Sequence, residues 1–141
     1  MNRLRLPATL ESLEGFRSFL GQELEHLDVP PARRLEIELV LEELLTNIIR
    51  YAYPPGQGEV EVGYSLKHPH RLCLFLMDWG RRFNPLECEP PELSPDLSRR
   101  PIGGLGVYLA RQLADDLEYR YGDHANQVTL CFDLSPPPAD S

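Results

Sequence analysis

The sequence predicts an α+β fold: a two-layer sandwich in which one mixed, mostly antiparallel sheet is covered on one face by three helices. Two observations predict it. The 141 residues correspond to one domain. Segments with strand character come in adjacent pairs, and the first two segments with helix character are consecutive. That order is not an alternation of single strands and helices, so a doubly wound parallel sheet is disfavoured.

The N-terminal half predicts one strand and two helices. Leucines alternating with arginines indicate a short strand over residues 2–7. Apolar residues at steps of three and four then predict a helix ending near residue 26. A second helix is predicted over 32–53, because Pro54-Pro55-Gly56 ends it. Its broad apolar arc consists of Ile37, Val40, Leu41, Leu44, Leu45, Ile48 and Ala52.

The C-terminal half predicts two hairpins separated by a long loop and a third helix. The predicted strands are 59–67, 71–79, 117–121 and 127–134, with a turn at 122–126. The proline-rich loop begins at Gly80, and a helix from residue 103 to about 116 follows it. Loops of this length in compact domains are usually functional or disordered. We expect a single domain over 1–134 and a disordered tail over 135–141.

Charge and composition exclude several classes of protein. Twenty-two acidic against 14 basic residues give a net charge of -8, which argues against duplex nucleic acid or an anionic membrane as partner. No apolar run is long enough for a membrane span, and no signal peptide is evident. The odd number of cysteines (Cys73, Cys88 and Cys131) and the absence of C-x-x-C favour a reduced cytoplasmic protein with buried or idle thiols.

The first candidate site is the pair Glu43 and Asn47, four residues apart on the second predicted helix. This spacing makes their side chains neighbours on one helix face, at the edge of the apolar arc. A carboxylate beside a carboxamide oxygen can hold Mg²⁺ or a metal-bound water, because magnesium needs few protein ligands. The alternative is a surface glutamate and an asparagine tolerated in a helix.

The second candidate site is Asp78-Trp79-Gly80, at the end of the most apolar predicted strand. Glycine lets the backbone turn away while the carboxylate points into a pocket. There it can accept a hydrogen bond from an amino group such as the exocyclic amine of adenine. The alternative is a turn that ends the strand, because an Asp-x-Gly pair by itself is common.

The third candidate site is Gly103-Gly104-Leu105-Gly106, at the start of the third predicted helix. Glycines let the backbone approach a phosphate, and a helix N-terminus offers N–H groups and a positive dipole end. The segment is neither the dinucleotide fingerprint nor a P-loop. A flexible loop that ends in a helix is the alternative.

The three sites together suit a nucleotide, which needs a metal contact, an amine contact, a phosphate contact and a lid. Glu43-Leu-Leu-Thr-Asn47, Asp78-Trp-Gly-Arg-Arg-Phe83 and Gly103-Gly-Leu-Gly106 resemble the N, G1 and G2 boxes of the GHKL ATP-binding superfamily. The chain looks most like the bacterial anti-sigma-factor serine/threonine kinases, from Leu4 to about Leu134. The resemblance implies the histidine-kinase-like (Bergerat) ATP-binding fold.

The resemblance also implies roles for individual residues, with ATP and Mg²⁺ as cofactors. Glu43 is expected to be the general base and Asn47 the Mg²⁺ ligand. Nucleotide binding is expected of Asn47, Asp78, Gly80, Phe83, Gly103, Gly104, Leu105, Gly106 and Thr129. Asp78 would hold the adenine amine, with room provided by Gly80, and Thr129 would support Asp78 through a water.

The sequence departs from the family pattern in places. Tyr51 stands four residues after Asn47, where the family often has histidine, and we expect it to pack on the same side. The lid is expected over 86–101. Arg99 and Arg100 in it either reach the γ-phosphate or are solvated charges, the latter being usual for arginine.

The resemblance implies a protein serine/threonine kinase that binds a sigma factor and phosphorylates a small antagonist protein, in a partner-switching system. It suggests a homodimer in the cytoplasm, with no nucleic-acid or membrane partner. One alternative is a non-catalytic ATP-binding module that regulates through protein contacts, although a glutamate at position 43 argues against it. Another is a detached histidine-kinase catalytic domain, but no helical pair with a phosphoacceptor histidine precedes the domain.

Overall fold

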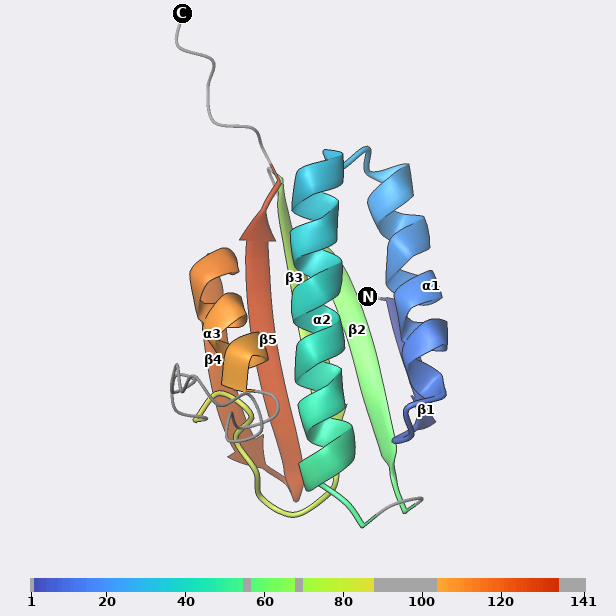
Figure 1. Cartoon of the computed structure of the whole chain (residues 1–141), viewed down its shortest axis with the longest axis vertical. Helices are drawn as coiled ribbons and strands as arrows, with labels where there is room; N and C mark the ends of the chain where they lie inside the picture. The colour runs from blue at the N-terminus through green and yellow to red at the C-terminus, as the bar shows by residue number, and fades with distance from the viewer. Residues whose placement is uncertain (1, 55–56, 68–69, 88–103, 135–141) are drawn as a thin grey trace, which may run out of the picture.

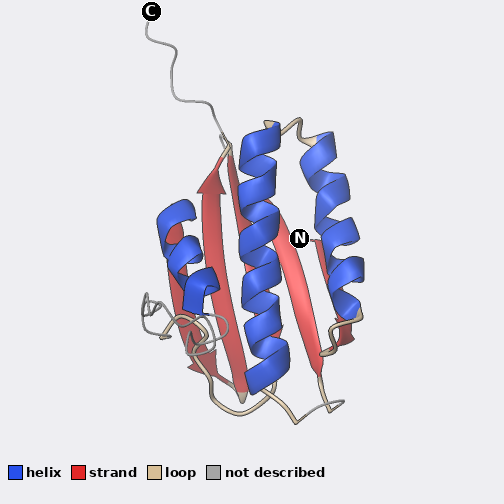
Figure 2. Cartoon of the chain, viewed as in Figure 1, coloured by secondary structure: helices blue, strands red, loops and turns tan. Residues whose placement is uncertain are grey.

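A computed structural model describes residues 2–54, 57–67, 70–87 and 104–134. Its elements are, in order, β1 (Asn2–Pro7), α1 (Ser12–His26), α2 (Pro31–Tyr51), β2 (Glu59–Lys67), β3 (Arg71–Asp78), α3 (Gly104–Leu113), β4 (Asp116–Gly122) and β5 (Ala125–Asp133). The strands of these ranges form one antiparallel sheet in the order β1-β2-β3-β5-β4. The helices lie over one of its faces (Figures 1 and 2). The predicted α+β sandwich is confirmed.

The ends of three elements meet at one end of the molecule. α2 ends at Tyr51 and β3 ends at Asp78, each slightly earlier than the pattern predicts. Figure 1 shows α2 ending at the bottom of the view and α3 beginning in the lower half of the same view. The three sequence motifs are therefore carried to the same end of the sandwich.

The turn between β4 and β5 is shorter than predicted. Asp123 and His124 have positive φ angles of 53° and 61°. Two consecutive residues in this conformation make the tight hairpin turn whose twist matches that of the flanking strands. The sequence-based turn over 122–126 is therefore wrong at its C-terminal side: Ala125 and Asn126 are strand residues that pair with Gly122 and Tyr121.

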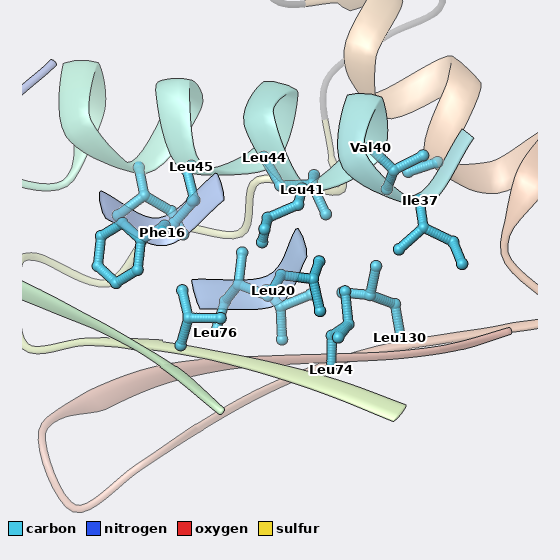
Figure 3. Close-up of a cluster of buried hydrophobic side chains, with 14 of the residues drawn as sticks. Phe16, Leu20, Ile37, Val40, Leu41, Leu44, Leu45, Leu74, Leu76 and Leu130 are labelled. Carbon is cyan, nitrogen blue, oxygen red and sulfur yellow. The ribbon is translucent and has the colours of Figure 1, made fainter. Parts of the chain in front are cut away.

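The core lies between the helices and the sheet. Side chains alternate along each strand, so every second residue points to the helices. Figure 3 shows leucines of β3 and β5 against the apolar side of α2 and two residues of α1. Residues at this contact with 0–2% exposure include Phe16, Leu20, Ile37, Val40, Leu41, Leu44, Leu45, Leu74, Leu76 and Leu130. Each such burial contributes about 1.5–3 kcal/mol, so α2 is held firmly against β3.

The cysteines depart from the sequence expectation. Cys73 of β3 and Cys131 of β5 are directly opposite in the antiparallel register, and a disulfide joins them across a Cα–Cα distance of 4.1 Å. The residues on either side of each cysteine face the helices, so the two cysteines lie on the sheet face away from the helices. The expectation of idle thiols is wrong for this pair, because strand register decides the pairing. Cys88 lies outside the described residues.

Two further expectations fall largely outside the described ranges. The predicted lid over 86–101 is described only at Leu86 and Glu87, and the predicted tail over 135–141 is not described. Both stay predictions. None of the described helices is long and apolar enough to cross a membrane.

Candidate functional site

Asp78 is a buried carboxylate at the last position of β3. Its side chain is only 1% exposed. Oδ1 accepts hydrogen bonds from the backbone N–H of Gly80 at 3.0 Å and from Nδ2 of Asn126 at 2.9 Å. Burial raises the pKa of Asp78, while the hydrogen bonds from Asn126 and Gly80 act to lower it. Among the described residues, both side-chain hydrogen bonds to Asp78 end on Oδ1, which leaves Oδ2 for a ligand.

Gly80 brings the loop after β3 against the end of α2. A Cβ at this position would lie 2.2 Å from the carbonyl oxygen of Ala52, a contact that no side chain can have. The same oxygen accepts a hydrogen bond of 3.0 Å from the backbone N–H of Arg81. The glycine is thus required by the close approach of two backbones, in addition to any role beside a nucleotide.

Tyr53 anchors the loop on its other side. Its hydroxyl accepts a hydrogen bond from the backbone N–H of Trp79 at 2.6 Å and donates one to the carbonyl oxygen of Glu59 at 2.8 Å. Burial raises the pKa of Tyr53, so the hydroxyl stays protonated and can donate. The residue next to Asp78 is therefore tied both to the segment after α2 and to β2.

Glu43 and Asn47 lie on α2, close to this contact. Asn47 is 1% exposed, and Glu43 is partly exposed. Asn47 precedes Ala52 by five residues, which corresponds to about 7.5 Å along the helix axis. One turn beyond Asn47, the ring of Tyr51 packs on that of Phe83 with 5.7 Å between centroids. The N-box and G1 motifs are therefore adjacent, and Tyr51 packs as expected.

A hollow of about 460 Å³ opens beside these residues. Its lining includes Tyr51, Trp79 and Gly80, together with Arg50 and Arg81. Two arginines at its edge raise the local positive potential, which favours an anion nearby. The hollow lies next to Asp78 rather than over it, since neither Asp78 nor Asn47 lines it.

The third motif begins α3. Gly104, Leu105 and Gly106 form the first turn of this helix, while Gly103 lies outside the described residues. α3 is also tied to the loop after β3, because Nη2 of Arg111 donates a hydrogen bond to the carbonyl oxygen of Leu86. This contact joins the last turn of α3 to the loop, and the helix itself begins in the lower half of the view in Figure 1.

Thr129 does not reach Asp78. In the register between β3 and β5, Asp78 is opposite Asn126, and Thr129 is opposite Phe75. Because strand side chains alternate between the two faces, Thr129 points away from the helices. It lines a hollow of about 160 Å³ on the uncovered face of the sheet. The expected support of Asp78 by Thr129 is therefore wrong, and Asn126 takes that place directly.

Sequence reasoning missed Asn126, Tyr119 and Tyr53. Asn126 was assigned to a turn, where asparagine is common. The available signal is weak: aspartate and histidine adopt positive φ more often than most residues, so Asp123-His124 can form a two-residue turn, which moves Asn126 into the strand opposite the end of β3. No sequence pattern indicated the hydroxyl contacts of the two tyrosines.

The residues present suit an adenine nucleotide. A buried carboxylate with one oxygen already engaged offers the other to an amino group, and Gly80 lets the loop that follows it pack on the end of α2. Within the described ranges no group of three or more His, Cys, Asp or Glu residues is arranged to hold a metal. A magnesium ion that arrives with a nucleotide needs few protein ligands, and Asn47 can supply one.

Comparison with known proteins defines the family. The model of the histidine kinase-like ATPase domain matches residues 6–132, and the chain belongs to this family. Over 104 residues it is 29% identical to the serine/threonine-protein kinase BtrW of Bordetella bronchiseptica, a match that covers 73% of this chain and 72% of that protein. Over 124 residues it is 27% identical to the serine-protein kinase RsbW of Bacillus mycoides, covering 85% and 77%.

A solved structure supports the fold. The RsbU and RsbW domains of a Mycobacterium tuberculosis protein superpose with a TM-score of 0.64 at 16% identity, covering 97% of this chain and 34% of that one. The chain thus spans about a third of that structure, and the likeness shows the fold alone. The names of the two relatives confirm the sequence-based expectation of a protein serine/threonine kinase.

Proposed function

We propose that this protein is an ATP- and Mg²⁺-dependent serine/threonine kinase of the anti-sigma-factor type. It would bind a sigma factor and phosphorylate a small antagonist protein, so that the two compete for it. The proposed ATP site rests on the burial of Asp78, a 1% exposed carboxylate whose Oδ1 accepts hydrogen bonds from Asn126 and Gly80. It lies next to α2, the helix that carries Glu43 and Asn47.

The nucleotide would be held at its two ends. Asp78 would accept a hydrogen bond from the adenine amine, and Phe83, packed on Tyr51, would help to shape that end of the site. At the other end, the backbone N–H groups of the first turn of α3 favour phosphate. Asn47 would offer its carboxamide oxygen to the magnesium. ATP, when bound, supplies the transferable γ-phosphoryl group.

Glu43 is the proposed catalytic residue. It is partly exposed, one helical turn before the buried Asn47, so an incoming hydroxyl can reach it. Its carboxylate would take the proton from a serine or threonine hydroxyl of the substrate. Phosphoryl transfer depends mainly on positioning, charge neutralisation and such a base.

The partner assignment follows from the two relatives named serine kinases and from the charge of the chain. A net charge of -8 favours a protein partner over nucleic acid or an anionic membrane. Such a partner-switching kinase would act in the cytoplasm. A homodimer stays part of the proposal, as does a lid over residues 86–101.

A non-catalytic ATP-binding module is the second candidate function. It shares the adenine site but needs no base at position 43. A glutamate there, on the same helix face as Asn47, favours the kinase.

Binding is tested by calorimetric titration of ATP with Mg²⁺ into wild type, Asn47→Ala and Asp78→Asn. We expect micromolar affinity in wild type and its loss in both variants. No detectable binding by wild type would refute the ATP site and leave a fold kept for protein contacts.

Catalysis is tested by γ-labelled phosphotransfer to candidate antagonist proteins. Glu43→Gln should bind ATP as wild type does but transfer phosphate at least about a hundredfold more slowly, since a general base contributes that much. Glu42→Gln is the matched control, because Glu42 is the neighbouring glutamate and forms an ion pair with Arg17. Equal transfer rates for the two variants would refute Glu43 as the base, whereas no transfer by wild type would support the non-catalytic module.

A further inference from the structure

Asn126 is a buried amide with a complete set of partners. It is 1% exposed. Its Nδ2 donates to Oδ1 of Asp78 at 2.9 Å and to the carbonyl oxygen of Arg81 at 2.8 Å. Its Oδ1 accepts from the backbone N–H of Phe83 at 2.9 Å and from the hydroxyl of Tyr119 at 2.5 Å. One side chain thus connects the end of β3, the loop after it and β4.

The orientation of this amide is determined by its neighbours. If the two ends of the Asn126 side chain were exchanged, its oxygen would face two acceptors, the carboxylate of Asp78 and the carbonyl oxygen of Arg81. Its NH₂ group would then face the N–H of Phe83. Unpaired buried polar groups are costly, so only the observed orientation is stable. Asn126 therefore always presents N–H groups to Asp78 and to the loop.

The fixed NH₂ group of Asn126 determines which oxygen of Asp78 is available to a ligand. Asn126 and Gly80 both engage Oδ1, so the carboxylate is held in one plane with Oδ2 directed elsewhere. A carboxylate held in this way accepts hydrogen bonds and donates none. A purine with an amino group at C6 satisfies it, whereas a purine with a C6 keto group leaves two acceptors facing each other.

We propose that Asn126 is the positioning residue that makes Asp78 selective for the amino group of adenine. This role rests on the proposed ATP site. Asn126 acts through Asp78 and does not need to touch the nucleotide. It also links recognition of the base to the loop after β3, because the same amide holds Arg81 and Phe83.

Asn126→Asp is the decisive variant because it changes one NH₂ group into an oxygen of nearly the same shape. The new carboxylate can still accept from Phe83 and Tyr119, but it faces Oδ1 of Asp78. Ionising both carboxylates at this distance is costly, so the pair takes up a shared proton as the pH falls and is fully ionised only at the upper pH. The protonated form restores an O–H donor toward Asp78. The other charged or titratable groups near the pair are Tyr53, Arg82, Glu87 and Tyr119.

The experiment measures calorimetric affinities for ATP and for inosine triphosphate, whose base has the keto group, between about pH 5.5 and about pH 8. Wild type should prefer ATP by about tenfold or more at every pH. Asn126→Asp should bind ATP at least about tenfold more weakly at the upper pH, with a preference near one, and should regain affinity and preference as the pH falls. Gln127→Glu makes the same chemical change one residue away, on the opposite sheet face, and should behave as wild type.

The outcomes separate this inference from the proposed function. Wild type that binds no ATP would refute the ATP site itself. Wild type that prefers ATP, with Asn126→Asp keeping that preference at the upper pH, would overturn only the role of Asn126. A merely structural role would weaken both nucleotides equally and show no recovery at low pH, which also overturns it.

A measurement on wild type decides the question if the variant does not fold. The side-chain NH₂ resonances of Asn126 should be protected from solvent exchange and should shift when ATP is added. Inosine triphosphate at equal saturation should shift them less, because it lacks the amine that engages Asp78. Identical shifts with the two nucleotides would refute the inference.

Discussion

Asn126 of β5 lies directly opposite Asp78 of β3, and its side-chain amide donates to Asp78 Oδ1 over 2.9 Å. Both residues are 1% exposed and both belong to the helix-facing side of the sheet, where most other positions are apolar. The pair therefore places a polar spot at the edge of the core, at the end of the sandwich where α2 ends and α3 begins.

Asp78→Asn is expected to abolish ATP binding and to stabilise the fold at neutral pH. Burial raises the folded-state pKa of Asp78 above its ordinary value of 3.8. The folded state then binds the proton more tightly than the unfolded state, so the contribution of Asp78 to stability falls as pH rises from 3.8 through the raised pKa. The asparagine removes the buried charge and keeps an acceptor for Asn126 and Gly80.

Denaturant unfolding of both proteins from acidic to neutral pH checks this expectation. The stability advantage of Asp78→Asn should be largest at neutral pH and should shrink toward pH 4. Asp123→Asn, in the turn between β4 and β5, controls for the loss of one negative charge. An advantage independent of pH would contradict the assignment of the effect to the ionised carboxylate.

Gly80→Ala is expected to destabilise the protein by about 1–3 kcal/mol, the usual range for overpacking. The added Cβ would lie 2.2 Å from the carbonyl oxygen of Ala52, so the loop or the end of α2 must move. ATP affinity should fall as well, since Asp78 lies two residues away. Gly122→Ala is the control, because a Cβ there meets no atom within 4 Å. Equal stabilities for the two variants in thermal unfolding would show that the two backbones are not in close contact.

Reduction of the Cys73–Cys131 disulfide is expected to lower the free energy of unfolding by up to about 4 kcal/mol, the loop-closure value for residues 58 apart. Thiol titration in denaturant should find one reactive thiol of the three cysteines before reduction and all three after it. Cys88→Ser should remove the single initial thiol and leave the response to reductant unchanged. Three thiols in protein purified without reductant would mean that the pair stays reduced.

Tyr53→Phe is expected to cost about 1 kcal/mol of stability and to weaken ATP binding. The variant removes the acceptor for the backbone N–H of Trp79 and the donor to the carbonyl oxygen of Glu59. Trp79 is the only tryptophan of the chain, so its fluorescence reports directly on this loop. Tyr108→Phe, at an exposed position of α3, is the matched control. An unchanged emission spectrum and affinity in Tyr53→Phe would rule out an anchoring role.

The sequence was informative where short-range patterns decide the outcome. The helix-period stripe of α2 and the alternation in β2 predicted those elements closely, because burial of one face selects that period. Gly80 and Asp78 were named as a candidate site from their type and from the strand that precedes them. The conformation of Asp123 and His124 was not evident, since both residues adopt positive φ without a glycine signal. That difference moved Asn126 from a turn to a strand.

Some residues of the site are placed by interactions between near neighbours in the sequence, and others by contacts between distant segments. The sequence by itself determined the sandwich, the spacing of Glu43 and Asn47 on one helix face and the carboxylate at the end of β3, because helix and strand periods are local. Only the tertiary structure decided that Asn126 rather than Thr129 meets Asp78, and that Cys73 meets Cys131. Those contacts depend on the register between strands far apart in the chain. A shift of one residue in that register turns every side chain to the other face of the sheet.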